Sequence, residues 1–252
     1  DISLEPTSDD MEIEVNFDFI DPRPEFVPTV RTFLTNLADK RLPAHELATA
    51  ICDQVEVGTF IVGDTAERLE DAVYGFLSLL DIAAPTESME FIRNYIASKT
   101  DIRLEPGATV GLLLSERMVN LPIQLIPVIH SQLLQDINWA RENSIAFPQY
   151  THVVLLSRCQ RIYASGGSKK KRKSAVQQDV YYGKIEEQLL IEKASAVSYF
   201  TNELGSVTTT GVAPSTELHF SDDSSSEKFV AVLTWQNYVA AVSEMPSFFT
   251  QA

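Results

Sequence analysis

A short apolar run followed by a long amphipathic segment is the feature that most restricts the fold of this chain. The stretch 109–116 (TVGLLLSE), with its apolar run Val110–Leu114, has the length and composition of a short buried strand. After a short polar connection, apolar side chains recur at helical spacing, at Leu125, Ile126, Ile129, Leu133 and Ile137. Pro127 is tolerated only in a first turn, which predicts a regular helix from Pro127 onward. A buried strand that leads into such a helix is typical of a sheet covered by helices.

The remaining segments extend this mixed pattern. Segment 11–20 alternates apolar and polar residues, which predicts a strand with Ile13, Val15, Phe17 and Phe19 on its apolar face. Helical spacing predicts helices over 25–38, after Pro43 and from Pro85, with Thr86 as a candidate N-cap. Further strands are expected at 55–63, 73–82, 150–163 and 228–235, an extended segment at 181–200, and a short helix at 236–245. We therefore expect an α/β (α+β) fold, with a disordered acidic tail at 1–10 and a single domain at 11–252 whose mixed central sheet is flanked by helices.

The charge of the chain restricts its partners. Its 252 residues include 35 acidic and 20 basic ones, for a net charge of −15. Such a surface disfavours binding to nucleic acid or to an anionic membrane and favours basic partners. The acidic stretch 64–71 supplies a candidate patch for contact with a basic client, formed by Asp64, Glu67, Glu70 and Asp71. A second acidic group, at Asp222, Asp223 and Glu227, is equally consistent with a solvated linker.

Five basic residues stand in an unbroken row within this acidic chain, at Lys169, Lys170, Lys171, Arg172 and Lys173. Gly166, Gly167 and flanking serines predict a surface loop over 164–178. The run could grip phosphates, remain a solvated loop without a role, or serve as a nuclear import signal. An accessible lysine-rich peptide is what an import receptor recognises, so the third interpretation is favoured.

Motifs of common catalytic and metal sites are missing from the sequence. It contains neither a phosphate-binding GxxxxGK[ST] loop nor a GxGxxG fingerprint. The four histidines share no metal-ligand spacing, and segment 64–71 lacks the order of a calcium loop. Cys52 and Cys159 lie far apart, which favours reduced thiols in an intracellular protein. We expect no catalytic residues, no metal and no cofactor.

Ser115 is the one candidate nucleophile, because it follows a buried strand and precedes a helix. A nucleophile elbow needs glycines on both sides of the serine to relieve a strained turn, and none are present here. The favoured alternative is a hydrogen-bonded corner formed by Ser115, Glu116, Arg117 and Asn120. In that corner Glu116 and Arg117 would pair with the backbone or with each other.

Three stretches together resemble one known family, BCP/BCCIP. They are VNFDFIDP (15–22), GFLSLL (75–80) and VGLLLSERMVNLPIQLIPVIHSQL (110–133), which contains the signature residues Leu114, Ser115, Glu116, Arg117, Asn120 and Pro122. The basic loop followed by YGKIEEQLLIEKASAVSYF (182–200) is similar to the layout of the same family. The resemblance covers most of 11–245 and is weakest in the last fifty residues.

The resemblance implies a fold, a location and a role. The fold is that of the GNAT acetyltransferases, without the glycine-rich loop that holds the pyrophosphate of acetyl-CoA at a helix N-terminus. The corresponding stretch here, SERMVNLP, has no glycine, and Pro122 removes a donor. Members are nuclear proteins that shuttle to the cytoplasm and escort a basic protein of the large ribosomal subunit. Animal members also bind a cell-cycle kinase inhibitor and a recombination mediator, and an active acetyltransferase remains the third alternative.

Overall fold

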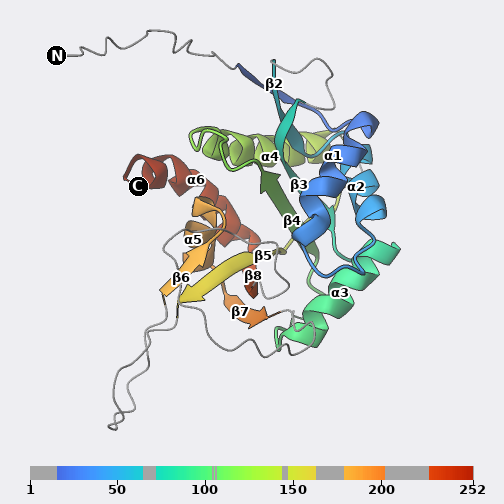
Figure 1. Cartoon of the computed structure of the whole chain (residues 1–252), viewed down its shortest axis with the longest axis vertical. Helices are drawn as coiled ribbons and strands as arrows, with labels where there is room; N and C mark the ends of the chain where they lie inside the picture. Colours follow the sequence, from blue (N-terminus) through green and yellow to red (C-terminus); the bar gives the residue numbers. More distant parts are fainter. Residues whose placement is uncertain are drawn as a thin grey trace, which may run out of the picture.

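The structure is a computed structural model that describes residues 16–64, 72–103, 105, 107–143, 147–162, 179–201 and 227–251. Within these residues, eight strands form one open sheet (Figure 1). The strands are β1 (Phe17–Ile20), β2 (Thr59–Gly63), β3 (Val73–Asp81), β4 (Val110–Arg117), β5 (His152–Ile162), β6 (Asp179–Tyr182), β7 (Ala196–Thr201) and β8 (Glu227–Thr234).

The sheet has the strand order β1-β2-β3-β4-β5-β8-β7, and β6 pairs with β5 beside this path. Neighbours in the order are antiparallel except β4 and β5, which are parallel. A parallel pair needs a crossover connection, and α4 (Leu125–Glu142) supplies it. This strand–helix–strand unit is the one that the apolar run and the following helical spacing predict.

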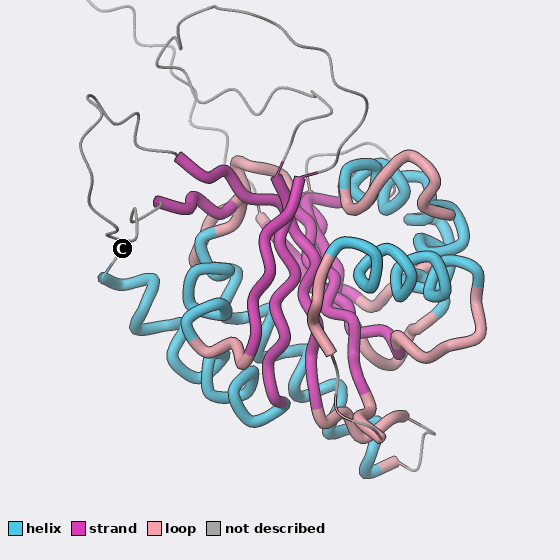
Figure 2. The backbone as a smooth tube through the Cα atoms, turned by 90° about the horizontal axis from the view of Figure 1, so that it is seen from below, coloured by secondary structure: helices cyan, strands magenta, loops and turns pink. Residues whose placement is uncertain are grey.

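Helices cover both faces of the sheet (Figure 2). One layer contains α1 (Val27–Phe33), α2 (Ala44–Asp53) and α3 (Glu87–Lys99). Short 3₁₀ turns at Pro24–Phe26 and Leu34–Asn36 flank α1. The other layer contains α4, α5 (Ile185–Glu192) and α6 (Trp235–Gln251). A single mixed sheet flanked by helices is thus confirmed as the fold class.

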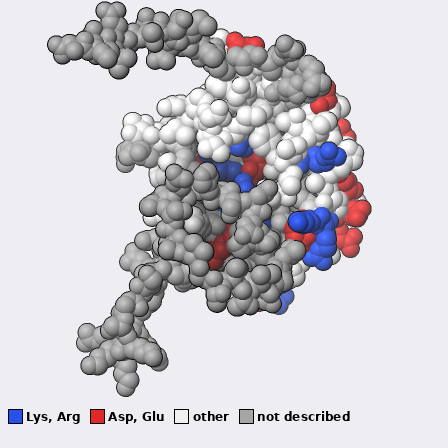
Figure 3. All heavy atoms as spheres, viewed as in Figure 1, with Lys and Arg blue, Asp and Glu red and all other residues white. Residues whose placement is uncertain are grey.

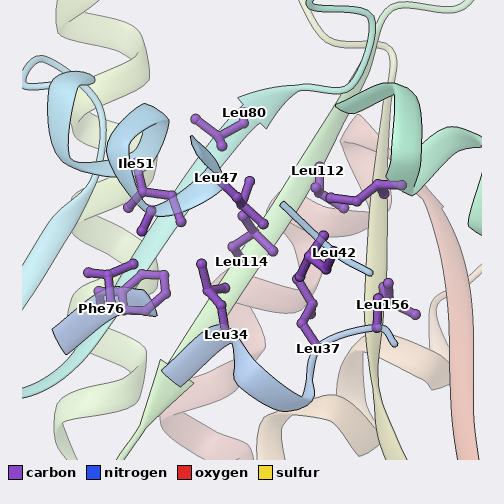
Figure 4. Close-up of a cluster of buried hydrophobic side chains, with 14 of the residues drawn as sticks. Leu34, Leu37, Leu42, Leu47, Ile51, Phe76, Leu80, Leu112, Leu114 and Leu156 are labelled. Atoms are coloured by element: carbon purple, nitrogen blue, oxygen red, sulfur yellow. The ribbon is translucent and has the colours of Figure 1, made fainter. Parts of the chain in front are cut away.

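The two layers produce two hydrophobic cores, one on each face of the sheet. Leu112 and Leu114 of β4 point to the α1–α3 side (Figure 4), whereas Leu113 points to the α4–α6 side. Because successive side chains of a strand alternate between faces, a strand buried on both faces must be apolar throughout. That requirement explains why β4 reads as an unbroken apolar run.

Several predicted boundaries shift in the structure. Strand β2 begins at Thr59, because Gly58 has φ +136° and interrupts the extended segment predicted from residue 55. Phe19 was expected to face inward with Phe17, but it is 37% exposed on the edge strand β1. Thr86 is confirmed as the N-cap of α3, since its Oγ1 accepts from the Met89 N–H at 3.3 Å. Helix α4 begins at Leu125, so Pro127 lies in its first turn as required.

Two larger differences concern the last third of the chain. Segment 181–200 was expected to be extended, yet it contains α5. The buried residues of this short helix include Glu186 and Glu187, so apolar spacing could not reveal it. The last helix was expected to end near residue 245, but α6 continues through Pro246 to Gln251.

Candidate functional site

The parallel strands β4 and β5 separate halfway along their length. They pair only over Val110–Leu113 and His152–Leu155. Beyond these residues β4 keeps its contact with β3, and β5 keeps its contact with β8, so the two strands point in different directions (Figure 1). The separation leaves one edge of each strand facing a gap in the middle of the sheet. In a mixed fold of this kind such a gap is a natural place for a ligand.

Here the chain fills the gap with its own residues. Strand β6 pairs with Cys159–Ile162 at the far end of β5. The Gly183 N–H then donates to the Arg158 carbonyl at 3.4 Å. The next residue, Lys184, is 9% exposed and projects its ammonium group between the separated strands.

Lys184 joins three elements through its ammonium group. Its Nζ lies 3.1 Å from Glu116 Oε1 on β4 and 3.4 Å from Ser157 Oγ on β5. It also lies 3.3 Å from Glu187 Oε1 in the first turn of α5. The Glu187 carboxylate in turn accepts from the Lys184 backbone N–H at 3.3 Å, which closes a capping box at the start of α5.

A second ion pair lies beside the first. The Arg117 guanidinium donates to both carboxylate oxygens of Glu186, with 2.8 Å between Nη2 and Oε2. This two-point geometry is the strongest that the two groups can adopt. Gly75 on β3 permits it, because a Cβ there would lie 2.8 Å from the Cβ of Arg117. We define the buried ionic cluster as Glu116, Arg117, Lys184, Glu186 and Glu187.

The charges of this cluster are held by one another. Burial by itself would lower the pKa of Lys184, but Glu116, Glu187 and Glu186 together raise it above its usual value. Burial opposes ionisation of Glu186 as well, yet the hydrogen bond from Arg117 holds the pKa of this carboxyl below its usual value. At Glu187 burial prevails and raises the pKa. The cluster links β4 to α5, and the contact of Lys184 with Ser157 extends this link to β5.

A buried pair of polar side chains lies close to the cluster on the α4–α6 side. His130 Nδ1 of α4 is 3.0 Å from the Tyr238 hydroxyl of α6, and both residues are 0% exposed. Burial lowers the pKa of His130 to about 4. The contact between His130 and Tyr238 joins α4 to α6.

The turn between β4 and α4 uses three of its N–H groups internally. The backbone N–H groups of Leu121, Leu125 and Ile126 donate to carbonyls within the turn itself, at 3.1–3.2 Å. Pro127 has no N–H to donate. Anion sites at helix N-termini require several free N–H groups that converge on one point, and these four positions supply none.

The structure revises the predicted corner around Ser115. Glu116 and Arg117 were expected to pair with the backbone or with each other, but they pair with Lys184 and Glu186. The reason is that consecutive strand residues point to opposite faces, so the two side chains cannot meet. Leu114 is buried in the core, Ser115 is half-buried on β4, and Asn120 and Pro122 are exposed in the turn.

The other predicted site residues fall mostly outside the described residues. Asp64 is described, and its two carboxylate oxygens accept from the backbone and side-chain N–H groups of Asn16, at 3.2 and 2.8 Å. This bonding gives Asp64 a structural role at the end of β2. Glu67, Glu70 and Asp71, the basic run Lys169–Lys173, and Asp222 and Asp223 lie outside the described residues.

The described residues contain neither of two other kinds of site. No group of three or more histidine, cysteine or carboxylate residues is arranged to hold a metal ion there. None of the described helices is long and apolar enough to cross a membrane. Cys52 and Cys159 are both buried and form no disulfide.

Sequence reasoning missed Lys184, Glu186, Glu187 and Lys228 as buried charged residues. Lys228 on β8 is 1% exposed, and its ammonium donates to the Asn36 carbonyl. Charged residues are rarely buried unless they have partners, and partners from distant segments leave no periodic signal. The one available signal was that SER (115–117) and GKIEE (183–187) both lie in stretches that resemble the same family.

Comparison with known proteins explains why these stretches occur together. The family model for BCCIP matches residues 12–190. A relative named "Protein BCCIP homolog" from Arabidopsis thaliana is 28% identical over 208 residues, which cover 73% of this chain and 61% of the relative. "BRCA2 and CDKN1A-interacting protein" from Mus musculus is 26% identical over 170 residues, which cover 59% of this chain and 54% of the relative. The chain thus spans less than two thirds of either protein.

One solved structure has the same fold. The crystal structure of BCP1 from Saccharomyces cerevisiae has a TM-score of 0.58 at 17% identity, and the match covers 97% of this chain and 93% of that one. NAA60 of Arabidopsis thaliana in complex with acetyl-CoA is a more distant neighbour, with a TM-score of 0.42 at 8% identity. By its family model, which matches residues 12–190, the chain belongs to the BCCIP family.

Proposed function

We propose that this chain is a non-enzymatic nuclear binding protein that escorts a basic protein of the large ribosomal subunit. The non-enzymatic part of the proposal rests on the gap between β4 and β5, which a side chain of the protein itself occupies. The Lys184 ammonium lies between the two strands, and three N–H groups of the turn before α4 donate to carbonyls of that turn. No cofactor is needed for an escort role.

Charge supports the second part of the proposal. Ribosomal proteins are rich in lysine and arginine, and away from RNA they need a partner of opposite charge. This chain has a net charge of −15. Acidic side chains follow the edge of the molecule on the side of α1–α3 (Figure 3). Asp53, Glu56, Glu87 and Glu90, in or near α2 and α3, are exposed. The stretch 64–71, most of which lies outside the described residues, remains our candidate for client contact.

The experiment is affinity purification of the tagged protein from its own cells, at low and high salt. We expect one basic ribosomal protein in near-equal amount at low salt and its loss at high salt, because charge attraction is screened. E67Q/E70Q/D71N should weaken capture, whereas the control E142Q/E192Q/E244Q removes the same charge from exposed positions of α4, α5 and α6 and should not. Absence of any enriched ribosomal protein would overturn the escort proposal.

A second candidate function is adaptor binding in the cell cycle and DNA repair. The supporting observation is that the mouse relative is named for interaction with BRCA2 and CDKN1A. The same purification separates the two functions. Enrichment of a kinase inhibitor or a recombination mediator, with ribosomal proteins at background level, would favour the adaptor.

The enzyme alternative makes a different prediction. We expect acetyl-CoA to leave the melting temperature of this protein unchanged, because Lys184 occupies the gap between β4 and β5. A ligand present at 100 times its Kd would instead add about 2.7 kcal/mol to the free energy of unfolding. A differential scanning fluorimetry titration measures this, with an active acetyltransferase as the positive control. A saturable rise in melting temperature would instead favour the acetyltransferase alternative.

We further propose that Lys169–Lys173 bind a nuclear import receptor. Replacement of all five residues by serine should move the protein from the nucleus to the cytoplasm without changing its melting temperature. Imaging should use a fusion too large to diffuse through nuclear pores, because the chain itself is only 28.1 kDa. Continued nuclear accumulation of the fusion would show that import depends on another segment.

A further inference from the structure

A hollow of about 350 Å³ lies between α3 and the part of the sheet that α1 and α2 leave uncovered. Three valines from β5 and β8 form its floor, namely Val154, Val230 and Val232, and they are only 0–4% exposed. Its walls come from α3 and from the segments at either end of α3, and consist of Ile82, Arg93, Ile96, Ala97, Ile102 and Arg103. The volume lies in the range of ordinary ligand sites, and the lining is apolar except for the two arginines.

The two arginines have no carboxylate partner within the described part of the chain. Arg93 Nη1 donates to the carbonyls of Ile82 and Ala84, at 2.5 and 3.2 Å, which fixes its guanidinium on the wall. Arg103 is exposed at the rim. Neither forms an ion pair within 4.0 Å among the described residues, whereas Arg117 and Arg41 each do.

Two guanidinium groups without a carboxylate partner among the described residues, beside an apolar wall, define what the hollow can select. A guanidinium presents a planar fork of donors that matches a carboxylate. The exposed Ala97 and the half-buried Ile96 and Ile102 can pack against an aliphatic or aromatic side chain and offer it no hydrogen bond. A ligand that fits must therefore carry an apolar group and a carboxylate a few ångströms apart.

We propose that this hollow binds a short acidic segment of a partner protein, with an apolar side chain against Ile96, Ala97 and Ile102, above the buried valines, and a neighbouring glutamate or aspartate at Arg93 and Arg103. Charge complementarity is the reason for this choice, because the rest of the surface is acidic and repels such a segment. The site is separate from the proposed function. A basic client and an acidic segment would use surfaces of opposite charge, and the protein could hold both at once.

The probe is the capped tripeptide acetyl-Glu-Phe-Glu-amide, observed by NMR through the methyl groups of the protein. We expect saturable shifts of the Val154, Val230 and Val232 methyls at millimolar peptide. The matched peptide acetyl-Gln-Phe-Gln-amide keeps the apolar side chain without the charge and should bind about fivefold more weakly. A third ligand, 3-phenylpropionate, tests whether a free carboxylic acid suffices.

Matched protein variants place the interaction at the rim. R103E should weaken binding of the acidic tripeptide by about fivefold or more, because a paired charge becomes a repelling one. R31E makes the same charge change at an exposed arginine of α1, outside the hollow, and should bind as the parent does. Any one of three results would overturn the proposal. They are equal binding of the two tripeptides, no shift of the valine methyls, and tighter binding of 3-phenylpropionate than of the acidic tripeptide.

Discussion

Replacement of Lys184 by methionine should lower the free energy of unfolding by about 3–5 kcal/mol. The substitution removes the ammonium group that lies 3.1 Å from Glu116 and 3.3 Å from Glu187, and leaves both carboxylates without their cation. Glu187 is 1% exposed, so water cannot replace the lost partner. Urea unfolding of the variant and the parent at neutral pH measures the difference.

Lys193→Met is the matched control for this experiment. Lys193 immediately follows α5 and pairs with Glu244 at 2.8 Å, but the Glu244 side chain is 53% exposed. A solvated pair of this kind contributes at most about 1 kcal/mol, so the control should lose little stability. Equal losses in the two variants would show that the buried ionic cluster does not hold α5 against the sheet.

A rescue experiment tests the stated cause of the loss. In the Lys184→Met background, the added changes E116Q and E187Q remove the two charges that need a cation. We expect them to restore about 1–2 kcal/mol, because a buried amide costs less than a buried carboxylate without a partner. A further loss of stability would instead attribute the first effect to packing of the lysine side chain.

The elements that the sequence predicted well are those whose signals are local. Val110–Leu114 reads as a strand because both faces of β4 are buried, and Thr86 caps α3 through an atom three residues from its partner N–H. Apolar spacing and capping operate within one or two turns of chain, so they can be read from a single stretch of sequence.

The candidate site could not be predicted in the same way, because its contacts join distant segments. Arg117 and Glu186 are 69 residues apart, and Glu116 and Lys184 are 68 residues apart. Each of these side chains is ionisable, and in isolation each reads as a surface residue. Both segments resemble the same family, but that resemblance did not indicate that they touch.

Lys228 presents the opposite case to Lys184, although both are buried lysines. Its ammonium donates to the Asn36 carbonyl, and no described carboxylate forms an ion pair with it. Burial, with a smaller contribution from the neighbouring Arg158, lowers the pKa of Lys228 to about 8 from its usual 10.5. The folded state therefore disfavours the charged form of this side chain.

This pKa difference makes stability depend on pH in a defined direction. Below pH 8 both the folded and the unfolded chain bind the proton, and between about pH 8 and pH 10.5 only the unfolded chain does. Because the unfolded chain then binds more protons, the contribution of Lys228 to the free energy of unfolding rises with pH across this window, by about 3 kcal/mol in total. The raised pKa of Lys184 changes the free energy of unfolding only above the usual lysine pKa of 10.5, and therefore outside this pH range.

We therefore expect Lys228→Met to have the opposite effect to Lys184→Met. At about pH 7 the variant should be about 1–2 kcal/mol more stable than the parent, because removal of a costly buried charge outweighs the lost hydrogen bond to Asn36. At about pH 9.5 the difference should shrink or reverse, since the parent has by then lost its proton. Urea unfolding at the two pH values measures both quantities, and the other titrating groups cancel in the comparison. A parallel pH dependence of the two proteins would mean that Lys228 keeps its usual pKa in the folded state. A destabilised variant at about pH 7 would mean that its bond to Asn36 outweighs the cost of burying its charge.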